Sequence, residues 1–131
     1  MVDTRWQSLS TSDRGREYLA LLSYLPLKGF RKMLTLQRQS GKVGKQLAHT
    51  RGLVGYSFRA KLSSHRFWTL SIWEDEGALM AFVRQDPHRA TMGLLRPFMG
   101  ETAFTRWTIR GSEVPPSWDD AIRRSEAAPT K

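Results

Sequence analysis

Four segments of the chain have the residue pattern of β-strands. Residues 18–25 form a short apolar run that ends before Pro26, and three later segments alternate apolar with polar or small residues. Successive side chains on a strand point to opposite faces of a sheet, so a period of two is typical of strands. The pattern predicts strands at residues 18–25, 53–62, 67–73 and 102–110. The polar link 63–66 joins the second and third, which are expected to form a hairpin.

Helical periodicity occupies the longer of the gaps between these strands. In residues 30–48, apolar or small residues recur every three or four positions, which is the spacing of one helical face. Gly41 and Gly44 lower the helix propensity by about 1 kcal/mol each relative to alanine. They predict either a break near Ser40 or a place where something lies against the helix.

A second helical gap begins at the acidic run 74–76, whose carboxylates suit the positive end of a helix. Apolar residues follow at helical spacing. Asp86 and Pro87 then have the pattern of a new N-cap and a first helical residue, and this second segment is expected to end at Pro97.

The order strand, helix, strand, strand, helix, strand is the split βαβ arrangement of a ferredoxin-like α+β fold. It predicts a four-stranded antiparallel sheet with both helices on one face. The strands are apolar on both faces, so the second face of a monomer would expose more apolar surface than soluble monomers tolerate. A second copy of the chain is expected to cover it, giving a homodimer of the dimeric α/β-barrel type.

The 131 residues are enough for one core. The expected division is a polar lead-in at 1–17, the ferredoxin-like domain at 18–111 and a tail with a short helix at 112–131. The lead-in lacks the apolar run of a signal peptide or a membrane span. With no cysteine the chain has no disulfide or thiolate chemistry, and a cytoplasmic location is expected.

The net charge of +9 is unevenly distributed, because the sequence between Glu17 and Glu74 has ten basic residues and no acidic one. Such a field attracts nucleic acid, anionic lipid or an anionic small molecule, although a solvated surface without a partner is the alternative. Nucleic acid is the less favoured partner, because the glycine-and-aromatic pattern of RNA-binding sheets is missing. Peripheral membrane contact through residues 28–45 stays open.

Residues 67–92 carry a resemblance to a known family. They contain a Trp-Glu-Asp turn that begins at Trp73, followed one helical segment later by His88. This stretch resembles the third strand and second helix of the antibiotic biosynthesis monooxygenase-like family, within the dimeric α/β-barrel superfamily, and the resemblance extends over residues 18–110. The superfamily includes cofactor-independent monooxygenases, haem-degrading enzymes, cyclases, lyases and proteins without known activity. The resemblance therefore implies a fold and leaves the chemistry open.

The resemblance also implies a ligand pocket between the sheet and the helices. Strand alternation places Phe67, Thr69, Ser71 and Trp73 on one face, where three of the four can donate a hydrogen bond. Trp73 matches a tryptophan that lines the pocket of haem-degrading relatives. The alternative is a core tryptophan that anchors the turn from strand to helix.

His88 and Met92 are four residues apart and share one face of a helix. In haem-degrading relatives the iron-ligating histidine lies where Met92 lies here, which argues against histidine-ligated haem. His88 is a candidate base or substitute ligand, because neutral imidazole serves either role, and a structural histidine near the helix start is the alternative. No dedicated metal site is expected, since His49 and His65 lack accompanying carboxylates.

Arg59 and Arg106 are candidate partners for an anionic ligand, because guanidinium pairs well with carboxylate, phosphate or phenolate; solvated positions at the sheet rim are the alternative. The leading function is binding of an aromatic or polycyclic, anionic or neutral small molecule, with cofactor-free oxygenation as the expected reaction. In that scheme Trp73 and Ser71 shape the pocket, His88 accepts the substrate proton, and an arginine stabilises negative charge. Haem binding and a non-catalytic dimeric module with a basic surface are the alternatives.

Overall fold

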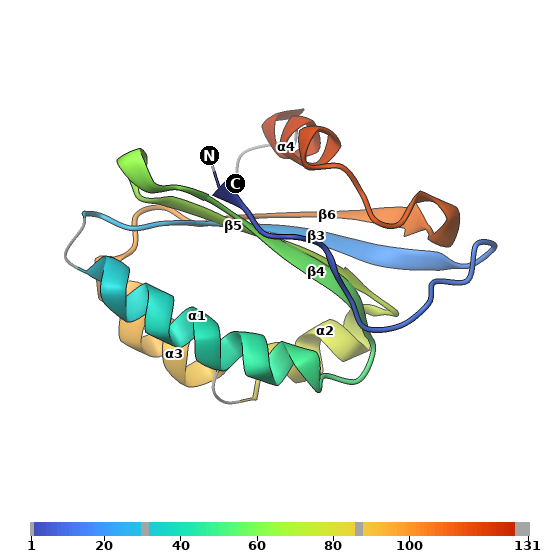
Figure 1. Ribbon diagram of the computed structural model, residues 1–131, viewed down its shortest axis with the longest axis horizontal. Helices are drawn as coiled ribbons and strands as arrows, with labels where there is room; N and C mark the ends of the chain where they lie inside the picture. Colours follow the sequence, from blue (N-terminus) through green and yellow to red (C-terminus); the bar gives the residue numbers. More distant parts are fainter. Residues whose placement is uncertain (1, 30–31, 86–87, 128–131) are drawn as a thin grey trace.

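The structure is a computed structural model that describes residues 2–29, 32–85 and 88–127. Within these residues, six strands form one sheet with α-helices on both faces (Figure 1). The strands are β1 (Val2–Asp3), β2 (Gln7–Ser8), β3 (Glu17–Pro26), β4 (Leu53–Lys61), β5 (Arg66–Trp73) and β6 (Ala103–Arg110). The helices are α1 (Met33–Ala48), α2 (Glu76–Val83), α3 (His88–Leu95) and α4 (Trp118–Ala127).

The four long strands match the predicted ones and lie in the order β4-β5-β3-β6, with every neighbouring pair antiparallel. This is the order that the split βαβ pattern predicts, so the ferredoxin-like α+β fold class is confirmed. The sheet is wider than the predicted four strands. β1 and β2, which come from the segment predicted as a polar lead-in, pair with the outer edge of β4. They satisfy backbone groups that an edge strand would otherwise leave unpaired.

Helices α1, α2 and α3 lie on one side of the sheet, which we call the helical face (Figure 1). Two apolar clusters fill it, one under α2 and the end of α1, the other under the start of α1 and the end of α3. Helix α1 is continuous through Gly41 and Gly44, so a break near Ser40 is wrong. A Cβ added at either glycine would meet nothing within 4 Å, so among the described residues nothing lies against the helix at these two positions.

The acidic run predicted to start the second helix does so. Asp75 is the N-cap of α2, and its Oδ1 accepts a hydrogen bond of 2.8 Å from the backbone N–H of Ala78. This contact satisfies one of the free N–H groups at the helix start. The second predicted start, at Asp86 and Pro87, lies outside the described residues, and α3 is described from His88.

The opposite side of the sheet, which we call the tail face, is covered by the chain itself. Helix α4 lies across it (Figure 1), and Ala121 and Ile122 pack against Leu22 and Leu70 of the two central strands. As a result, Leu22 is 1% exposed and Leu70 is 0% exposed. The same layer includes four tryptophans, Trp6, Trp68, Trp107 and Trp118.

The interpretation that a second copy alone can cover the tail face is therefore wrong. The sequence leaves the docking place of the tail helix open, and in the structure α4 and Trp6 cover much of the apolar area that would have driven dimerisation. The homodimer stays a prediction, and burial of the apolar tail face no longer supports it.

Polar contacts also hold α4 against the sheet. The indole Nε1 of Trp118 donates a hydrogen bond of 2.9 Å to Oγ of Ser57, a buried hydroxyl on β4. The guanidinium carbon of Arg59 lies 4.8 Å from the centroid of the Trp118 ring. The same guanidinium donates to both carboxylate oxygens of Asp3, at 2.7 and 2.9 Å. The tail is thus joined to the sheet and, through Arg59, to the N-terminal segment.

Trp118→Ala is expected to lower the free energy of unfolding by about 3 kcal/mol, because it removes a large ring from the tail face. Trp118→Phe keeps most of the ring but loses the hydrogen bond to Ser57, so its expected cost is about 1 kcal/mol. Urea unfolding followed by circular dichroism measures both variants. Wild-type stability in Trp118→Ala would show that α4 contributes nothing to the fold.

Candidate functional site

The predicted residues of β5 share the helical face, but they differ in how they are covered. Trp73 and Ser71 are buried, and the indole Nε1 of Trp73 donates a hydrogen bond of 2.8 Å to Ser71 Oγ. The rings of Trp73 and Phe82 on α2 lie 5.3 Å apart. The indole donor of Trp73 is therefore already used within its own strand, and the ring anchors the core under α2.

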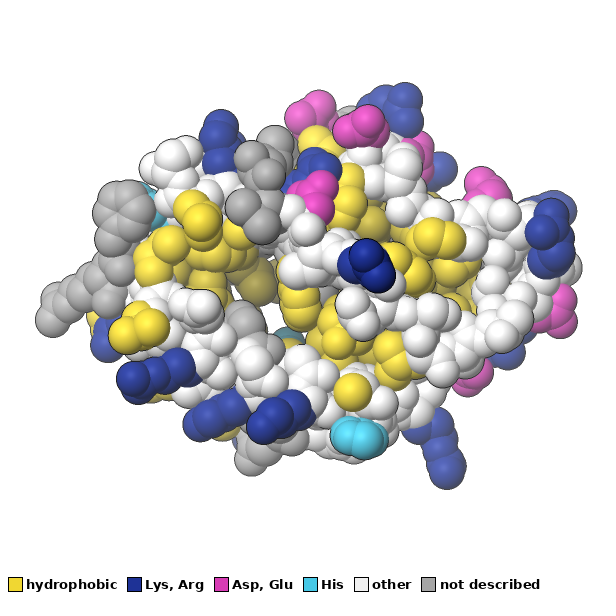
Figure 2. Space-filling model, in the orientation of Figure 1, with side chains coloured by type: hydrophobic (Ala, Val, Ile, Leu, Met, Phe, Trp, Pro, Cys, Tyr) yellow, Lys and Arg dark blue, Asp and Glu magenta, His cyan; other side chains and the backbone are white. Residues whose placement is uncertain are grey.

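The middle of the helical face is less covered. Phe58, Thr69 and Ser23 pair side by side across β4, β5 and β3, and all three are half-buried. At the same level of the tail face, Leu22 and Leu70 are fully buried. The helices therefore do not close over this row. Figure 2 shows the surface hollowed near its centre. We call the incompletely covered row of Phe58, Thr69 and Ser23 the central hollow.

The wall of the central hollow is uncharged. Phe58 supplies an aromatic surface, and Thr69 and Ser23 supply hydroxyl groups that can donate or accept a hydrogen bond. The neighbouring positions on this face of β3, β4 and β5 are also uncharged: Leu21, Leu25, Tyr56, Ala60, Phe67 and Ser71. Such a wall suits a flat, apolar molecule with a few hydrogen-bonding groups.

His88 lies at the start of α3, beside the end of α1, and its backbone N–H donates a hydrogen bond of 2.9 Å to Oε1 of Gln46. Its ring packs on Phe82 with centroids 4.8 Å apart, and Phe82 in turn contacts Trp73. Burial lowers the pKa of His88, and a hydrogen bond with the Val83 backbone offsets part of that effect. His88 Nδ1 is buried without a hydrogen-bond partner among the described residues. The imidazole is neutral near pH 7, as a base must be.

Five predicted site residues thus lie on the helical side in two groups. His88 and Trp73 both contact the ring of Phe82 on α2, and Ser71 is hydrogen-bonded to Trp73. This group lies at the end of the sheet where β5 leads into α2. Phe67 and Met92 meet in the apolar cluster at the other end. Thr69, a sixth predicted residue, lies between these groups in the central hollow.

The two predicted arginines lie on opposite faces of the sheet. Arg59 lies on the tail face, and its hydrogen bond lowers the pKa of Asp3. Arg106 lies on the helical face of the edge strand β6, opposite Leu21, and its Nη1 is 2.9 Å from Oε1 of Glu76. Each guanidinium already has a carboxylate partner, and Arg106 is the one of the two that shares a face with the central hollow. Among the described residues, no group of three His, Cys, Asp or Glu side chains is placed to hold a metal ion.

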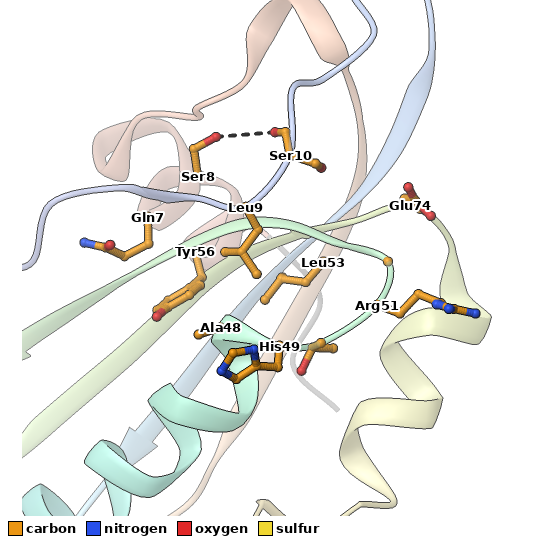
Figure 3. Close-up of a pocket in the computed structure, with 12 residues that line it drawn as sticks. Gln7, Ser8, Leu9, Ser10, Ala48, His49, Arg51, Leu53, Tyr56 and Glu74 are labelled. Atoms are coloured by element: carbon orange, nitrogen blue, oxygen red, sulfur yellow. Dashed lines mark hydrogen bonds between the residues drawn. The ribbon is translucent and has the colours of Figure 1, made fainter.

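A cavity of about 650 Å³ opens at the edge of the sheet, between the N-terminal segment, the end of α1 and the start of β4 (Figure 3). We call it the edge pocket. Tyr56 lies on its wall and contacts Phe58, with ring centroids 5.4 Å apart, so it connects this pocket to the wall of the central hollow. Burial raises the pKa of Tyr56, so its hydroxyl stays protonated near pH 7 and can donate a hydrogen bond. The polar lining includes Ser8, Ser10, His49, Arg51 and Glu74.

Sequence reasoning missed Ser23, Phe58 and Tyr56 as site residues. Alternation along the second strand placed Phe58 and Tyr56 on a common face, and that signal was available. The register that pairs Thr69 with both Phe58 and Ser23 depends on contacts between distant segments. The edge pocket also needs the N-terminal segment to pair with β4, which its polar sequence does not indicate.

No protein-family model and no curated protein sequence matches this chain. Solved structures do match it. The cofactor-independent oxygenase SnoaB from Streptomyces nogalater has a TM-score of 0.60 at 13% identity, covering 76% of this chain and 98% of its own. A proposed antibiotic biosynthesis monooxygenase from Nitrosomonas europaea has a TM-score of 0.61 at 10% identity, covering 68% and 95%. A conserved protein from Methanosarcina mazei has a TM-score of 0.61 at 17% identity, covering 69% and 90%.

The fold is that of antibiotic biosynthesis monooxygenase-like proteins. This confirms the resemblance found in residues 67–92. At such low identities the likeness concerns the antibiotic biosynthesis monooxygenase-like fold alone, and the chemistry has to be argued from this chain's own residues.

The free energy of unfolding is expected to fall as the pH drops below about 6.5, the ordinary pKa of histidine. Burial keeps His88 neutral in the folded protein, so the unfolded chain binds the proton more readily. The loss levels off below the lowered pKa of the folded state. Urea unfolding at about pH 7.5 and about pH 5.5 measures it. His88→Gln should reduce the difference, while His49→Gln, at an exposed position, should keep it. An undiminished difference in His88→Gln would assign the effect to other groups.

Proposed function

We propose that the central hollow binds a flat aromatic or polycyclic small molecule between the sheet and the helices. The observation that carries this proposal is that Phe58, Thr69 and Ser23, which form one row across the helical face, are all only half-buried. Phe58 offers a ring for stacking, and Thr69 offers a hydroxyl for a phenol or carbonyl of the ligand. The uncharged wall favours a ligand that enters in its neutral form.

We infer that the reaction is oxygenation of such a substrate without a bound cofactor. The cofactor-independent oxygenase SnoaB shares the fold of this chain. An electron-rich phenolic substrate that loses a proton to a base can itself reduce oxygen. A carbon–oxygen bond then forms, and loss of water from the hydroperoxide leaves a carbonyl, so that a CH₂ group and O₂ give C=O and H₂O. His88, neutral in the fold, is the base that we assign, and the low polarity of the wall favours electron transfer from the substrate anion.

Haem gains no specific support from its two candidate ligands, His88 and Met92. Either residue would have to direct its ring nitrogen or its sulfur atom at the iron. The His88 ring packs on Phe82 and hydrogen-bonds the Val83 backbone, and Met92 packs against an apolar cluster that contains Leu95. No step of the proposed reaction passes through haem.

Thr69→Phe is expected to fill the central hollow and weaken binding of a hydroxylated anthraquinone at least roughly tenfold. Thr108→Phe is the matched control, because Thr108 lies on the same face but is exposed on the edge strand β6. Fluorescence titration of the two variants and the wild type gives the dissociation constants. Equal affinity in all three would place the binding site elsewhere.

Oxygen uptake with an anthrone as the probe substrate is expected to fall roughly a hundredfold in His88→Gln, because the proton acceptor is lost. The dissociation constant of the anthraquinone probe should change little, because the Phe58 ring and the Thr69 hydroxyl that are proposed to hold it are unchanged in this variant. An oxygen electrode measures the rate. An unchanged rate in His88→Gln would remove His88 as the base, and binding of the probe without oxygen uptake by the wild type would remove the reaction.

A further inference from the structure

The large apolar side chains that remain exposed in the described part of the chain lie at one end of the fold. Leu34 is 62% exposed, Leu62 50%, Leu94 50% and Phe104 59%. They belong to the start of α1, the link after β4, the end of α3 and the start of β6. Because β3 and β4 end where β5 and β6 begin, these segments meet at the same end of the sheet, on the left in Figure 1.

The same end is positively charged. Among the described residues of its connecting segments, Glu101 is the one acidic side chain, against the five cations Lys28, Lys32, Lys61, Arg66 and Arg96. None of these cations has a carboxylate partner among the described residues. Arg66 instead donates to the Tyr24 hydroxyl at 2.9 Å, and the Lys32 ammonium lies 4.6 Å from the centroid of the Phe98 ring. We call this surface, with Leu34, Leu62, Leu94 and Phe104, the basic end.

The opposite end carries most of the acidic residues of the sheet domain. The turns before β3, between β5 and α2 and after β6 meet there, and they contain Asp13, Glu17, Glu74, Asp75, Glu76 and Glu113. Figure 2 shows acidic side chains mixed with Lys and Arg side chains along the upper and right parts of the view, and a row of Lys and Arg side chains along the lower edge on the left, over the helical layer. The opposite end also carries Arg14, Arg16, Arg51 and Arg110, so it has both signs of charge, whereas the basic end has almost only positive charge.

We propose that the basic end docks on an anionic lipid surface, with its apolar side chains at the headgroup level and its cations on the lipid phosphates. This combination of unpaired cations with exposed apolar tips is what interfacial binding requires. No helix in the described ranges is long and apolar enough to cross a bilayer, so the contact is peripheral. Leucine side chains cannot stack on bases as the aromatic platforms of RNA-binding proteins do, so lipid is favoured over RNA. The proposal does not depend on the proposed function.

Flotation with vesicles tests the proposal on the full-length chain. Vesicles that combine phosphatidylcholine with phosphatidylglycerol are expected to carry the protein, and vesicles of phosphatidylcholine alone are expected to carry far less. Binding should weaken as salt is added, because attraction to surface charge is screened over roughly 8 to 10 Å near physiological ionic strength. Equal binding to both kinds of vesicle would overturn the proposal.

Paired charge reversals locate the contact. Lys61→Glu with Arg96→Glu is expected to lower the partition coefficient roughly fivefold for each cation removed. Arg14→Glu with Arg110→Glu makes the same change in net charge at the opposite end and should bind like the wild type. All four side chains are exposed, so the fold should tolerate these changes. Equal loss in both double variants would show that net charge, and not the basic end, determines binding.

The apolar part of the contact needs a separate variant. Leu34→Ser with Leu94→Ser keeps the charge and should reduce the binding that persists at high salt, because it removes the side chains that enter the headgroup layer. Unchanged binding would contradict apolar insertion. A parallel titration with single-stranded RNA decides between partners: binding to RNA without binding to anionic vesicles would overturn the proposal.

Discussion

The two central strands, β3 and β5, have neighbours on both edges and apolar residues on both faces, so the whole structure depends on how those faces are covered. The tail face is sealed by α4, which packs Ala121 against Leu22 and Leu70. The bond from Trp118 Nε1 to Ser57 Oγ fixes its position. Because apolar burial is the main favourable term in folding, α4 stabilises the sheet from the tail face while α1, α2 and α3 cover the helical face. Half-buried residues such as Thr69 remain on the helical face without loss of the fold.

This division explains why residues of one strand have different roles. Along β5, Trp73 donates a hydrogen bond to Ser71 and both side chains are buried. Thr69, on the same face of the strand, is only half-buried. Helix α1 is continuous through Gly44, where a Cβ would meet nothing within 4 Å. Glycine lowers the helix propensity there by about 1 kcal/mol relative to alanine. Buried and half-buried residues therefore coexist on one face of the same strand.

Local patterns predicted the strands, the helices and their order, because those depend on the period of apolar residues and on caps such as Asp75. Contacts between residues that are far apart in the sequence could not be predicted from these patterns. The tail was expected to contain a helix, but nothing near Trp118 shows that its partner is Ser57, some 61 residues earlier. The Trp6 indole lies directly against Gly55, where any Cβ would collide with the ring. These two residues are also far apart in the sequence, so no local pattern indicates their contact. Arg59 was placed by alternation on one face of its strand, but that pattern does not say which face meets the helices.

The uneven distribution of charge over the molecule follows from the position of residues 18–73, which lack Asp and Glu, in the fold. Residues 18–73 contain no acidic side chain, and they span β3, α1, β4 and β5. The segments that connect β3 to α1 and β4 to β5 lie at the basic end, and their described residues are therefore all neutral or basic. The first acidic run, 74–76, follows β5 and falls at the opposite end, where Asp75 is also needed to cap α2. Two requirements of the fold, the antiparallel order of strands and the capping of one helix, thus leave one end of the molecule almost without acidic residues and place acidic residues among the arginines of the other end. Charge placed in this way acts over a Debye length of roughly 10 Å and orients the chain before any close contact forms.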